Sequence, residues 1–290
     1  MPRTKKAKTG QEIPVHKPPL KWAGAKTRLV TRILSLLPKG TTRLIEPFAG
    51  SAVVSLNARV PKFILADINK DLINLYKIIR DDSPGLIQML EGLFVPANNV
   101  RERYDEYRAK FNTRTLSSLE NAAIFVYLNR HAFNGLCRYN GRGEFNVPFG
   151  AIANPFLPAD AIRHASSVLG RAELIEGSFE TVLAKAEKGD FVYCDPPYVP
   201  LSLSASFTQY ATTDCRKEQQ EALVKAAIEA ADRGAIIAIS NHDTAETRLL
   251  YANANRVYSF PVSRTISSKG ENRKSVLELI AVYKPCRRFV

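Results

Sequence analysis

The stretch FVYCDPPY, residues 191–198, decides the fold because it joins an apolar strand to a rigid exit that carries polar groups. Two successive prolines fix the backbone and remove two N–H donors, so the Asp195 side chain and the carbonyls of Asp195 and Pro196 form a surface of acceptors. Tyr198 adds a stacking face. This combination suits a flat ring with an exocyclic amine, such as an extruded adenine or cytosine. Asp-Pro and Pro-Pro are also ordinary turn signals, so the stretch alone leaves that interpretation open.

A second strand end lies at residues 43–52, RLIEPFAGSA, where a short apolar strand runs into a tight turn of small residues. Small residues let a ligand approach the backbone at a helix N-terminus, and residues 53–56 indicate the start of a helix. Asp67 follows a strand at 63–66, the position at which nucleoside-binding α/β sheets place an acid for the ribose hydroxyls. The turn lacks a full G-x-G-x-x-G pattern, so a sulfonium nucleoside fits better than a dinucleotide.

The pattern along the rest of the chain predicts an α/β fold with a helical insertion. Apolar spacing predicts a helix over 26–37, and a helix between the strands at 43–46 and 63–66 would complete one right-handed βαβ unit. Later strands, the last two forming an antiparallel pair, are predicted at 172–176, 190–194, 235–240, 256–262 and 276–283, with a helix at 217–231. From about residue 70 to 158 the strand signal gives way to helical stretches at 70–80, 84–93, 100–112 and 117–130.

Composition favours a polyanionic partner. The chain has 41 Lys and Arg against 28 Asp and Glu, a net charge of +13, and nucleic acid is the obvious candidate. Its four cysteines and four histidines show no metal-ligand spacing, so neither a disulfide framework nor a metal site is expected. We expect the protein to reside in a reducing compartment. The apolar runs are too short to cross a bilayer and the amino terminus lacks a signal-peptide core, so we expect a soluble, cytoplasmic protein without a membrane partner.

Three basic segments leave their roles open. Residues 1–10 are expected to form a disordered arm whose cations either graze DNA or are merely solvated. Lys269 and its neighbours between the last two strands either bind phosphates or form a solvated hairpin tip. The segment 130–142 combines cations, amides and aromatics without a carboxylate until Glu144. Arginine is the commonest reader of guanine in the major groove, although a solvated basic loop is the alternative.

Seven blocks of sequence together resemble the Dam family of GATC-specific DNA adenine-N6 methyltransferases. They occur in the order of that family's alpha class and span the chain from Pro19 to about Pro285. The blocks are KWAGAK at 21–26, EPFAG at 46–50, LADIN at 65–69, NGLCRYN at 134–140, GEFNVPFG at 143–150, DPPY at 195–198 and SNHD at 240–243. Three positions depart from the family pattern, because Ala25 and Ala52 stand for its usual glycines and Phe133 for its usual tyrosine.

The resemblance implies both a fold and a reaction. The fold would be a Rossmann-like methyltransferase sheet, the catalytic domain at 1–69 and 159–290, with a mostly helical target-recognition domain inserted at 70–158. The reaction would transfer a methyl group from S-adenosylmethionine to N6 of a flipped-out adenine in double-stranded DNA, within GATC. A methyltransferase acting on another amine, in RNA or protein, is the alternative in the same class. A catalytically silent DNA-binding module is the alternative from another class.

The resemblance also implies residue roles. The cofactor would contact Trp22, Lys26, Phe48, Gly50, Asp67 and Asp195, and catalysis would fall to Asp195, Pro196, Pro197 and Tyr198. DNA would contact Lys21, Phe133, Asn134, Leu136, Arg138 and Pro148. Among these, Lys21 would reach the first guanine, Asn134 would take the place of the extruded adenine and Arg138 would read the far half of the site. No metal is implied, and the enzyme would act as a monomer at the nucleoid.

Overall fold

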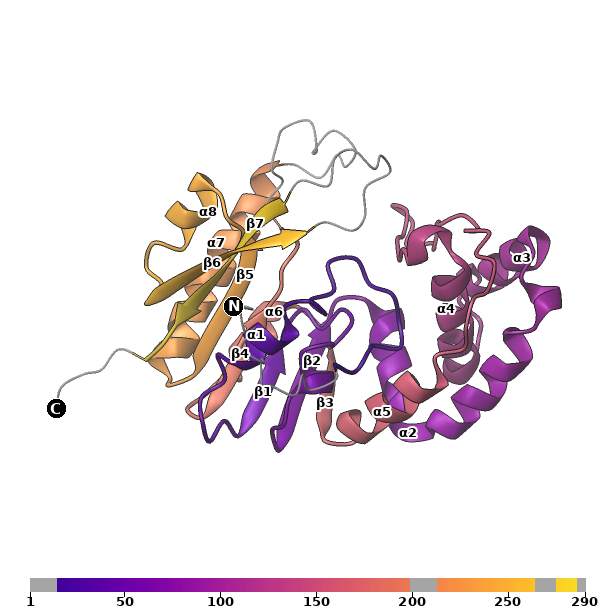
Figure 1. Cartoon of the computed structure of the whole chain (residues 1–290), viewed down its shortest axis with the longest axis horizontal. Coiled ribbons are helices and arrows are strands. Elements are labelled where there is room, and N and C mark those ends of the chain that lie inside the picture. The colour runs from indigo at the N-terminus through magenta and orange to yellow at the C-terminus, as the bar shows by residue number, and fades with distance from the viewer. Residues whose placement is uncertain (1–14, 199–212, 264–274, 286–290) are drawn as a thin grey trace, which may run out of the picture.

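The computed structural model describes residues 15–198, 213–263 and 275–285, so the predicted arm at 1–10 and Lys269 lie outside the described residues. Within these ranges, seven strands form one sheet in the order β3-β2-β1-β4-β5-β7-β6 (Figure 1). The strands are β1 Arg43–Glu46, β2 Lys62–Asp67, β3 Ala172–Glu176, β4 Asp190–Cys194, β5 Ile236–His242, β6 Arg256–Ser263 and β7 Ser275–Tyr283. The first five are parallel, and β7 is antiparallel to both of its neighbours. The predicted α/β class, a Rossmann-like sheet with a final antiparallel pair, is confirmed.

Helices flank the sheet and extend beyond one end of it. They are α1 Val30–Leu34, α2 Lys70–Leu93, α3 Arg101–Asn112, α4 Ser118–His131, α5 Ala159–Leu169, α6 Phe179–Leu183, α7 Thr213–Asp232 and α8 Ala245–Leu250. Three short 3-10 turns complete the order: η1 Ser55–Asn57, η2 Pro96–Asn98 and η3 Phe133–Gly135. No helix in the described ranges is long and apolar enough to cross a membrane.

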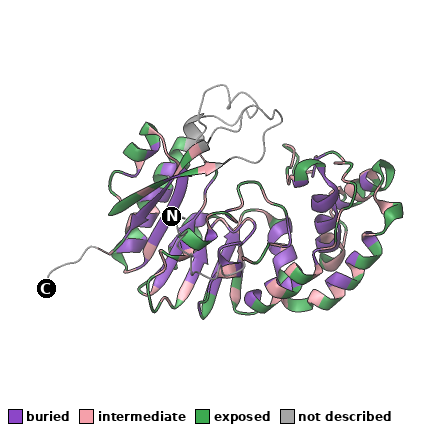
Figure 2. Cartoon of the chain, in the orientation of Figure 1, coloured by how far each residue is buried: buried purple, intermediate pink, exposed green. Residues whose placement is uncertain are grey.

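The two faces of the sheet belong to two separate cores, as the alternation of side chains along a strand requires. On β4, Phe191 and Tyr193 join the core that also contains the helices α2 and α4, whereas Val192 and Cys194 join the core under α7. All four side chains are at most 1% exposed. Figure 2 accordingly shows the central strands largely buried and the outer helix surfaces exposed.

The helical part between β2 and β3 lies beside the sheet (Figure 1) and packs chiefly through α2 and α4. Asn69 caps α2 by accepting from the backbone N–H groups of Asp71 and Leu72. The long helix contains a kink at Asp82, where the backbone leaves helical angles just before Pro84. A capping box formed by Ser117 and Glu120 begins α4. The helical stretches predicted for this part are confirmed, with the first two merged across the kink.

Two helix predictions were wrong or too long. The connection from β1 to β2 contains only the 3-10 turn η1, because the Asn57 side chain donates to the Val53 carbonyl at 2.8 Å and Ala58 is already extended. A side chain that bonds to nearby backbone competes with helical hydrogen bonding. The helix predicted over 26–37 is limited to α1, and residues 27–29 and 35–36 on either side of it form turns.

Candidate active site

The carboxyl ends of β1, β2 and β4 meet at one edge of the sheet and carry the predicted site residues. The chain leaves β1 toward β2 and β3 on one side, while β4 leads to β5 on the other, so the strand order reverses between β1 and β4. In open α/β sheets, ligands bind in the crevice at such a switch point. Gly50 follows β1, Asp67 ends β2 and Asp195 follows β4.

Asp195 is held on both of its carboxylate oxygens. Its Oδ2 lies 2.8 Å from the Lys26 ammonium, and its Oδ1 accepts from the Ser240 hydroxyl at 2.7 Å. Ser240 lies on β5 and in turn accepts from the Tyr193 hydroxyl at 3.1 Å. The side chain is 21% exposed, so the carboxylate is fixed in place but remains open to a ligand.

Tyr198 is fixed by contacts on its ring and on its hydroxyl. The hydroxyl donates to Glu278 Oε2 on β7 at 3.1 Å, and the ring packs edge-on against His242 with centroids 4.7 Å apart. The Lys26 ammonium lies 4.6 Å from the ring centroid. Burial, and then the charge of Asp195, raises the pKa of Tyr198 well above its ordinary value, so the phenol stays protonated. The motif thereby presents a rigid aromatic side chain beside the carboxylate.

The two prolines sit between these side chains. Pro196 is buried, and Pro197 is exposed with its carbonyl accepting from the Gln220 side chain on α7 at 3.0 Å. Neither proline carries an N–H donor. The turn that leads from Asp195 to Tyr198 is therefore anchored from α7 and leaves acceptors at the sheet edge.

The turn after β1 is a tight cradle. Gly50 has a φ of +45°, and a Cβ at this position would lie 2.8 Å from the Trp22 indole nitrogen, so only glycine fits under the ring. Its N–H donates to Asp67 Oδ2 at 3.0 Å, while Asn69 N–H donates to Asp67 Oδ1 at 2.9 Å. The Gly50 carbonyl accepts from the Tyr76 hydroxyl. Burial raises the pKa of Asp67, although these backbone donors oppose the rise.

Glu46 and Phe48 belong to the segment that leads from β1 into this turn. Glu46 is 3% exposed and accepts from the Ser55 N–H at 2.8 Å. Burial raises its pKa to about 7, the hydrogen bonds from Ser55 lower it in part, and the charge of Asp195 raises it further. Phe48 stacks on Phe179 of α6 with centroids 5.5 Å apart.

The predicted DNA-contacting residues gather at a second place, around the turn η3. Asn134 has a φ of +55°, an uncommon conformation for a residue other than glycine, and its side chain is exposed. The Phe133 N–H donates to the Pro148 carbonyl at 2.9 Å, which joins two predicted positions that are distant in sequence. Leu136 is half-buried against the core. Backbone strain of this kind is often stored at functional sites.

Lys21 is joined to this turn through a residue that the sequence did not single out. Asn129, fully buried near the end of α4, accepts from the Lys21 N–H at 2.9 Å and donates to the Lys21 carbonyl at 2.8 Å. It also donates to the Gly135 carbonyl at 3.0 Å. Burial, and then repulsion by Arg130, lowers the pKa of Lys21.

Arg138 lies at the start of a hairpin formed by residues 138–146, in which Tyr139 and Phe145 face each other across an antiparallel bridge. Its side chain is exposed, and its Nε donates to the Asn146 side chain at 2.8 Å. Its Nη2 also donates to the Asn146 carbonyl at 3.3 Å, so Asn146 orients the guanidinium, whose other donors can reach a partner.

The three departures from the family pattern differ in structure. Ala52 has a φ of +54°, the left-handed region in which glycine carries no penalty, so the added methyl group introduces local strain. Ala25 is not among the residues with positive φ. Phe133 is 51% exposed and keeps an aromatic face without the hydroxyl.

The cysteines and the possible metal ligands bear on whether the protein could use a thiol nucleophile or a metal ion. Cys194 is fully buried, and desolvation raises the pKa of its thiol above its ordinary value, as it raises that of Cys137 to about 12. Both groups are therefore thiols and poor nucleophiles. Among the described residues, no group of His, Cys, Asp or Glu is arranged to hold a metal ion.

Sequence reasoning missed the residues that support the site: Asn129, Gln220, Ser240 and Glu278. Ser240 lies within the SNHD block, to which the resemblance assigns no role. That block is the sequence signal that could have identified Ser240. The other three contact the site only through the tertiary structure.

Comparison with known proteins agrees with this geometry. A family model described as D12 class N6 adenine-specific DNA methyltransferase matches residues 22–265. The chain is 44% identical over 266 residues to the DNA adenine methylase of Escherichia coli (strain K12), an alignment covering 92% of this chain and 95% of that protein. It is 42% identical over 270 residues to the DNA adenine methylase of Haemophilus influenzae, covering 92% and 94%. With the DNA adenine methylase of Vibrio cholerae (strain O395) it shares 42% over 267 residues, covering 92% and 95%.

Proposed function

The chain belongs to the D12 class of N6 adenine-specific DNA methyltransferases, and from this premise we propose that it methylates the adenine of GATC with S-adenosylmethionine after flipping that adenine out of the duplex. Methyl transfer to N6 of adenine in DNA is the activity of the family. The finer assignments rest on the residues of the two sites. The segment 70–158 would recognise the target, and the sheet would carry catalysis.

The cofactor site is supported by the cradle around Gly50. Only a residue without a side chain fits beneath Trp22, and an acid with open lone pairs lies beside it at Asp67. A carboxylate has about four lone-pair sites, so Asp67 can accept ribose hydroxyls while it keeps its two backbone donors. The Lys26 ammonium would face the carboxylate of the methionine part, and Phe48 would pack on the adenine ring. When bound, S-adenosylmethionine supplies an electrophilic methyl group on its sulfonium.

Asp195, Pro196 and Tyr198 would act on the low nucleophilicity of the adenine amine, which is the main obstacle to the reaction. The lone pair of the adenine amine is delocalised into the ring, which makes the amine a poor nucleophile. Asp195 and the Pro196 carbonyl would accept hydrogen bonds from the two N–H groups of the amine. These bonds would favour a pyramidal nitrogen and aim its lone pair away from the ring. Asp195 keeps unused lone pairs for this task although Lys26 and Ser240 each bond one oxygen. Tyr198, fixed by Glu278, would stack on the ring.

Catalysis in this site is therefore a matter of positioning and electrostatics. The Lys26 ammonium, 2.8 Å from Asp195 Oδ2, fixes the direction of the carboxylate, whose remaining lone pairs can accept hydrogen bonds. No strong base is needed beforehand, because the methylated amine is cationic and strongly acidic, so it can then release its proton to solvent water. The leaving group is a neutral thioether and needs no general acid.

The target site is proposed from the exposed residues around η3 and the 138–146 hairpin. Asn134, projecting from a strained turn, would enter the duplex and fill the place of the extruded base. Arg138 has the donors that recognise guanine, and Pro148 would lie against a thymine methyl. Lys21 would reach the first guanine. Phe133 would stack on a neighbouring base.

The grouping of Lys26, Asp195 and Tyr198 at the switch point carries the proposal. Transfer of labelled methyl groups to duplexes that contain GATC, or the same bases in permuted order, tests it directly, with single-stranded RNA and protein as alternative acceptors. Sequencing of modified adenines in DNA from a host that expresses the chain gives the recognition site independently. Equal labelling of permuted sites would refute GATC recognition. We further propose a monomeric, cytoplasmic enzyme associated with the nucleoid.

A further inference from the structure

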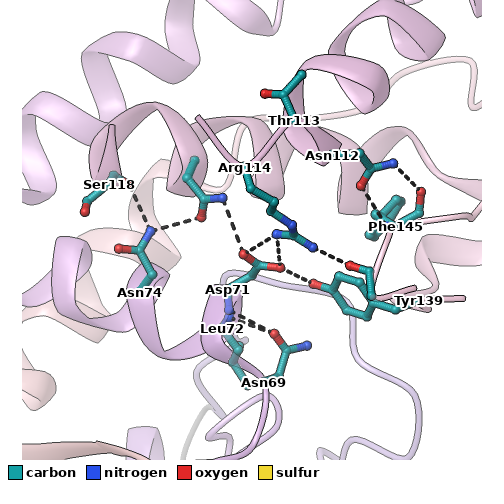
Figure 3. A network of polar contacts seen from close by, with 12 residues as sticks. Asn69, Asp71, Leu72, Asn74, Asn112, Thr113, Arg114, Ser118, Tyr139 and Phe145 are labelled. Atoms are coloured by element: carbon teal, nitrogen blue, oxygen red, sulfur yellow. Dashed lines mark hydrogen bonds and ion pairs between the residues drawn. The ribbon is translucent and has the colours of Figure 1, made fainter. Parts of the chain in front are cut away.

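A buried carboxylate between the two sites has no part in the mechanism described above. Asp71 lies at the start of α2 and is 4% exposed. Its two oxygens accept from Arg114 Nη1 at 2.8 and 2.9 Å, and Oδ2 also accepts from the Tyr139 hydroxyl at 2.8 Å (Figure 3). A weaker contact from the Asn121 side chain, at 3.4 Å, completes the set.

The main hydrogen-bond partners of the Asp71 side chain, Arg114 and Tyr139, lie outside α2. An acid in the first turn of a helix ordinarily stabilises the helix dipole and faces solvent. Here Asn69 already caps α2, and the Asp71 side chain is directed at the 138–146 hairpin and at Arg114, which precedes α4 (Figure 3). The carboxylate therefore serves a contact between segments.

Arg114 extends the same contact to the far side of the hairpin. Its Nη2 donates to the Gly143 carbonyl at 2.6 Å, and its backbone has a φ of +62°, in the left-handed region. A residue other than glycine persists in that conformation only where surrounding contacts hold it. Tyr139 at one side of the hairpin and Gly143 at its turn are thus tied to one partly buried ion pair.

The backbone of Asp71 is linked by hydrogen bonds through Asn69 to Asp67, on the side of the proposed cofactor site. Asp67, at the end of β2, accepts from the Asn69 N–H, and Asn69 accepts from the Asp71 N–H at 3.1 Å. The Asn69 side chain also reaches Cys137 Sγ at 3.9 Å, next to Arg138. Asp71 therefore stands at a fixed position relative to β2 and fixes the hairpin relative to the same strand.

We propose that Asp71 is a positioning residue for sequence recognition, which holds the 138–146 hairpin through Tyr139 and Arg114 so that Arg138 meets its base pair in register. The inference rests on the proposed function in assigning Arg138 to a guanine of the far half-site. A guanidinium recognises guanine through two hydrogen bonds of defined direction, so a small displacement of the hairpin weakens selection at that pair. Burial raises the pKa of Tyr139, so its hydroxyl remains a donor to Asp71.

Tyr139→Phe is the smallest test, because it removes one hydroxyl and keeps the ring against Phe145. We expect the ratio of kcat/KM for GATC over duplexes altered at the fourth base pair to fall about tenfold, the scale of one hydrogen bond to a charged group. The ratio against duplexes altered at the first base pair should stay unchanged. Asp71→Asn, which keeps the shape but loses the charge, should show the same selective loss.

Tyr127→Phe is the matched control. The Tyr127 hydroxyl is also buried in the helical part and donates to the Asn98 carbonyl at 2.5 Å, away from the hairpin. Its loss should leave both ratios unchanged, whereas a merely destabilised helical part would change all variants alike. Unfolding of each variant in urea shows whether the folded state is retained.

A double variant with Arg138→Ala separates the inference from the proposed function. If Arg138→Ala relaxes selection at the fourth pair and Tyr139→Phe adds nothing further in that background, the positioning role is supported. If Arg138→Ala relaxes selection but Tyr139→Phe and Asp71→Asn leave the ratio intact, the positioning role is overturned and the role of Arg138 stands. If Arg138→Ala itself has no effect on selection, the role of Arg138 is wrong and the role of Asp71 fails with it.

Discussion

Lys26 and Asp195 come from opposite halves of the chain, yet the ammonium of one lies 2.8 Å from a carboxylate oxygen of the other, with side chains only 8% and 21% exposed. A charge-assisted contact of this kind fixes the direction of the carboxylate. Asp195 is therefore suited to accept hydrogen bonds from a ligand through its remaining lone pairs. The pair defines what substitutions at this position should do.

Asp195→Asn should retain measurable methyl transfer, whereas Asp195→Ala should lose nearly all of it. The amide oxygen still accepts from the adenine amine, but a neutral hydrogen bond has roughly half the strength of a charge-assisted one. Alanine removes the acceptor, and the loss of one comparable stabilising contact typically costs ~10²–10³ in turnover. Single-turnover rates on a GATC duplex at saturating cofactor give the comparison. An Asn variant as inactive as the Ala variant, with both still binding cofactor and DNA, would show that the negative charge itself is essential.

Glu46 should make the stability of the protein depend on pH. Burial raises its pKa to about 7 in the folded state, so folding takes up a proton between its ordinary pKa of 4.5 and that value. Its contribution to stability is full below about pH 4.5 and is lost as the pH rises through 7. From pH 5 to pH 8 we expect a loss of about 2–3 kcal/mol from this residue.

Glu46→Gln tests this expectation, because an amide does not titrate. The variant should become more stable than the parent at pH 8, and urea unfolding at several pH values, extrapolated linearly, measures the difference. Parallel stability curves for parent and variant would exclude a raised pKa at Glu46.

Asn134→Ala should impair extrusion of the adenine more than binding of the duplex. Unstacking a paired base costs a few kcal/mol, and a mispaired adenine is already partly open, so a mispaired target should restore the variant. Because Asn134 has a φ of +55°, alanine also introduces strain, and Asn134→Gly removes the amide without it. Both variants should show the same rescue, followed by 2-aminopurine fluorescence at the target. Equal defects on paired and mispaired adenine would argue against the role.

Arg138→Ala should relax selection for one guanine by about 1–3 kcal/mol of discrimination, since a bidentate contact is lost. Methylation of GATC and of sites with single substitutions gives the profile. Arg142→Ala, which alters an exposed cation of the same hairpin, should leave the profile unchanged even if all duplexes bind more weakly. A profile for Arg138→Ala identical to that of the parent would remove Arg138 from base recognition.

The strands could be predicted from sequence because buried apolar runs such as 190–194 end in polar residues, and those ends place Asp67 and Asp195 at one edge. The absence of a helix after β1 could not be predicted, because it depends on the Asn57 side chain, which donates to the Val53 carbonyl four residues earlier. The roles assigned to individual side chains stay predictions.

The residues that hold the predicted site residues in place could not be predicted from the sequence, because their contacts are distant along the chain. Glu278 meets Tyr198 and Asn129 meets Lys21 only after distant segments have packed, and neither has a local signal of its own. Acids are common at helix starts, and only the contacts of Asp71 with Arg114 and Tyr139 distinguish it from them.

The place of β7 in the sheet bears on the order in which the protein is made. β7 is the last of the described strands along the chain, yet it lies between β5 and β6. During synthesis, which proceeds from the N-terminus, β5 must keep an unpaired edge until residues 275–283 leave the ribosome. Glu278, which bonds Tyr198, arrives with the same strand. The nascent chain therefore cannot complete the surroundings of Tyr198 until β7 has been synthesised and has left the ribosome.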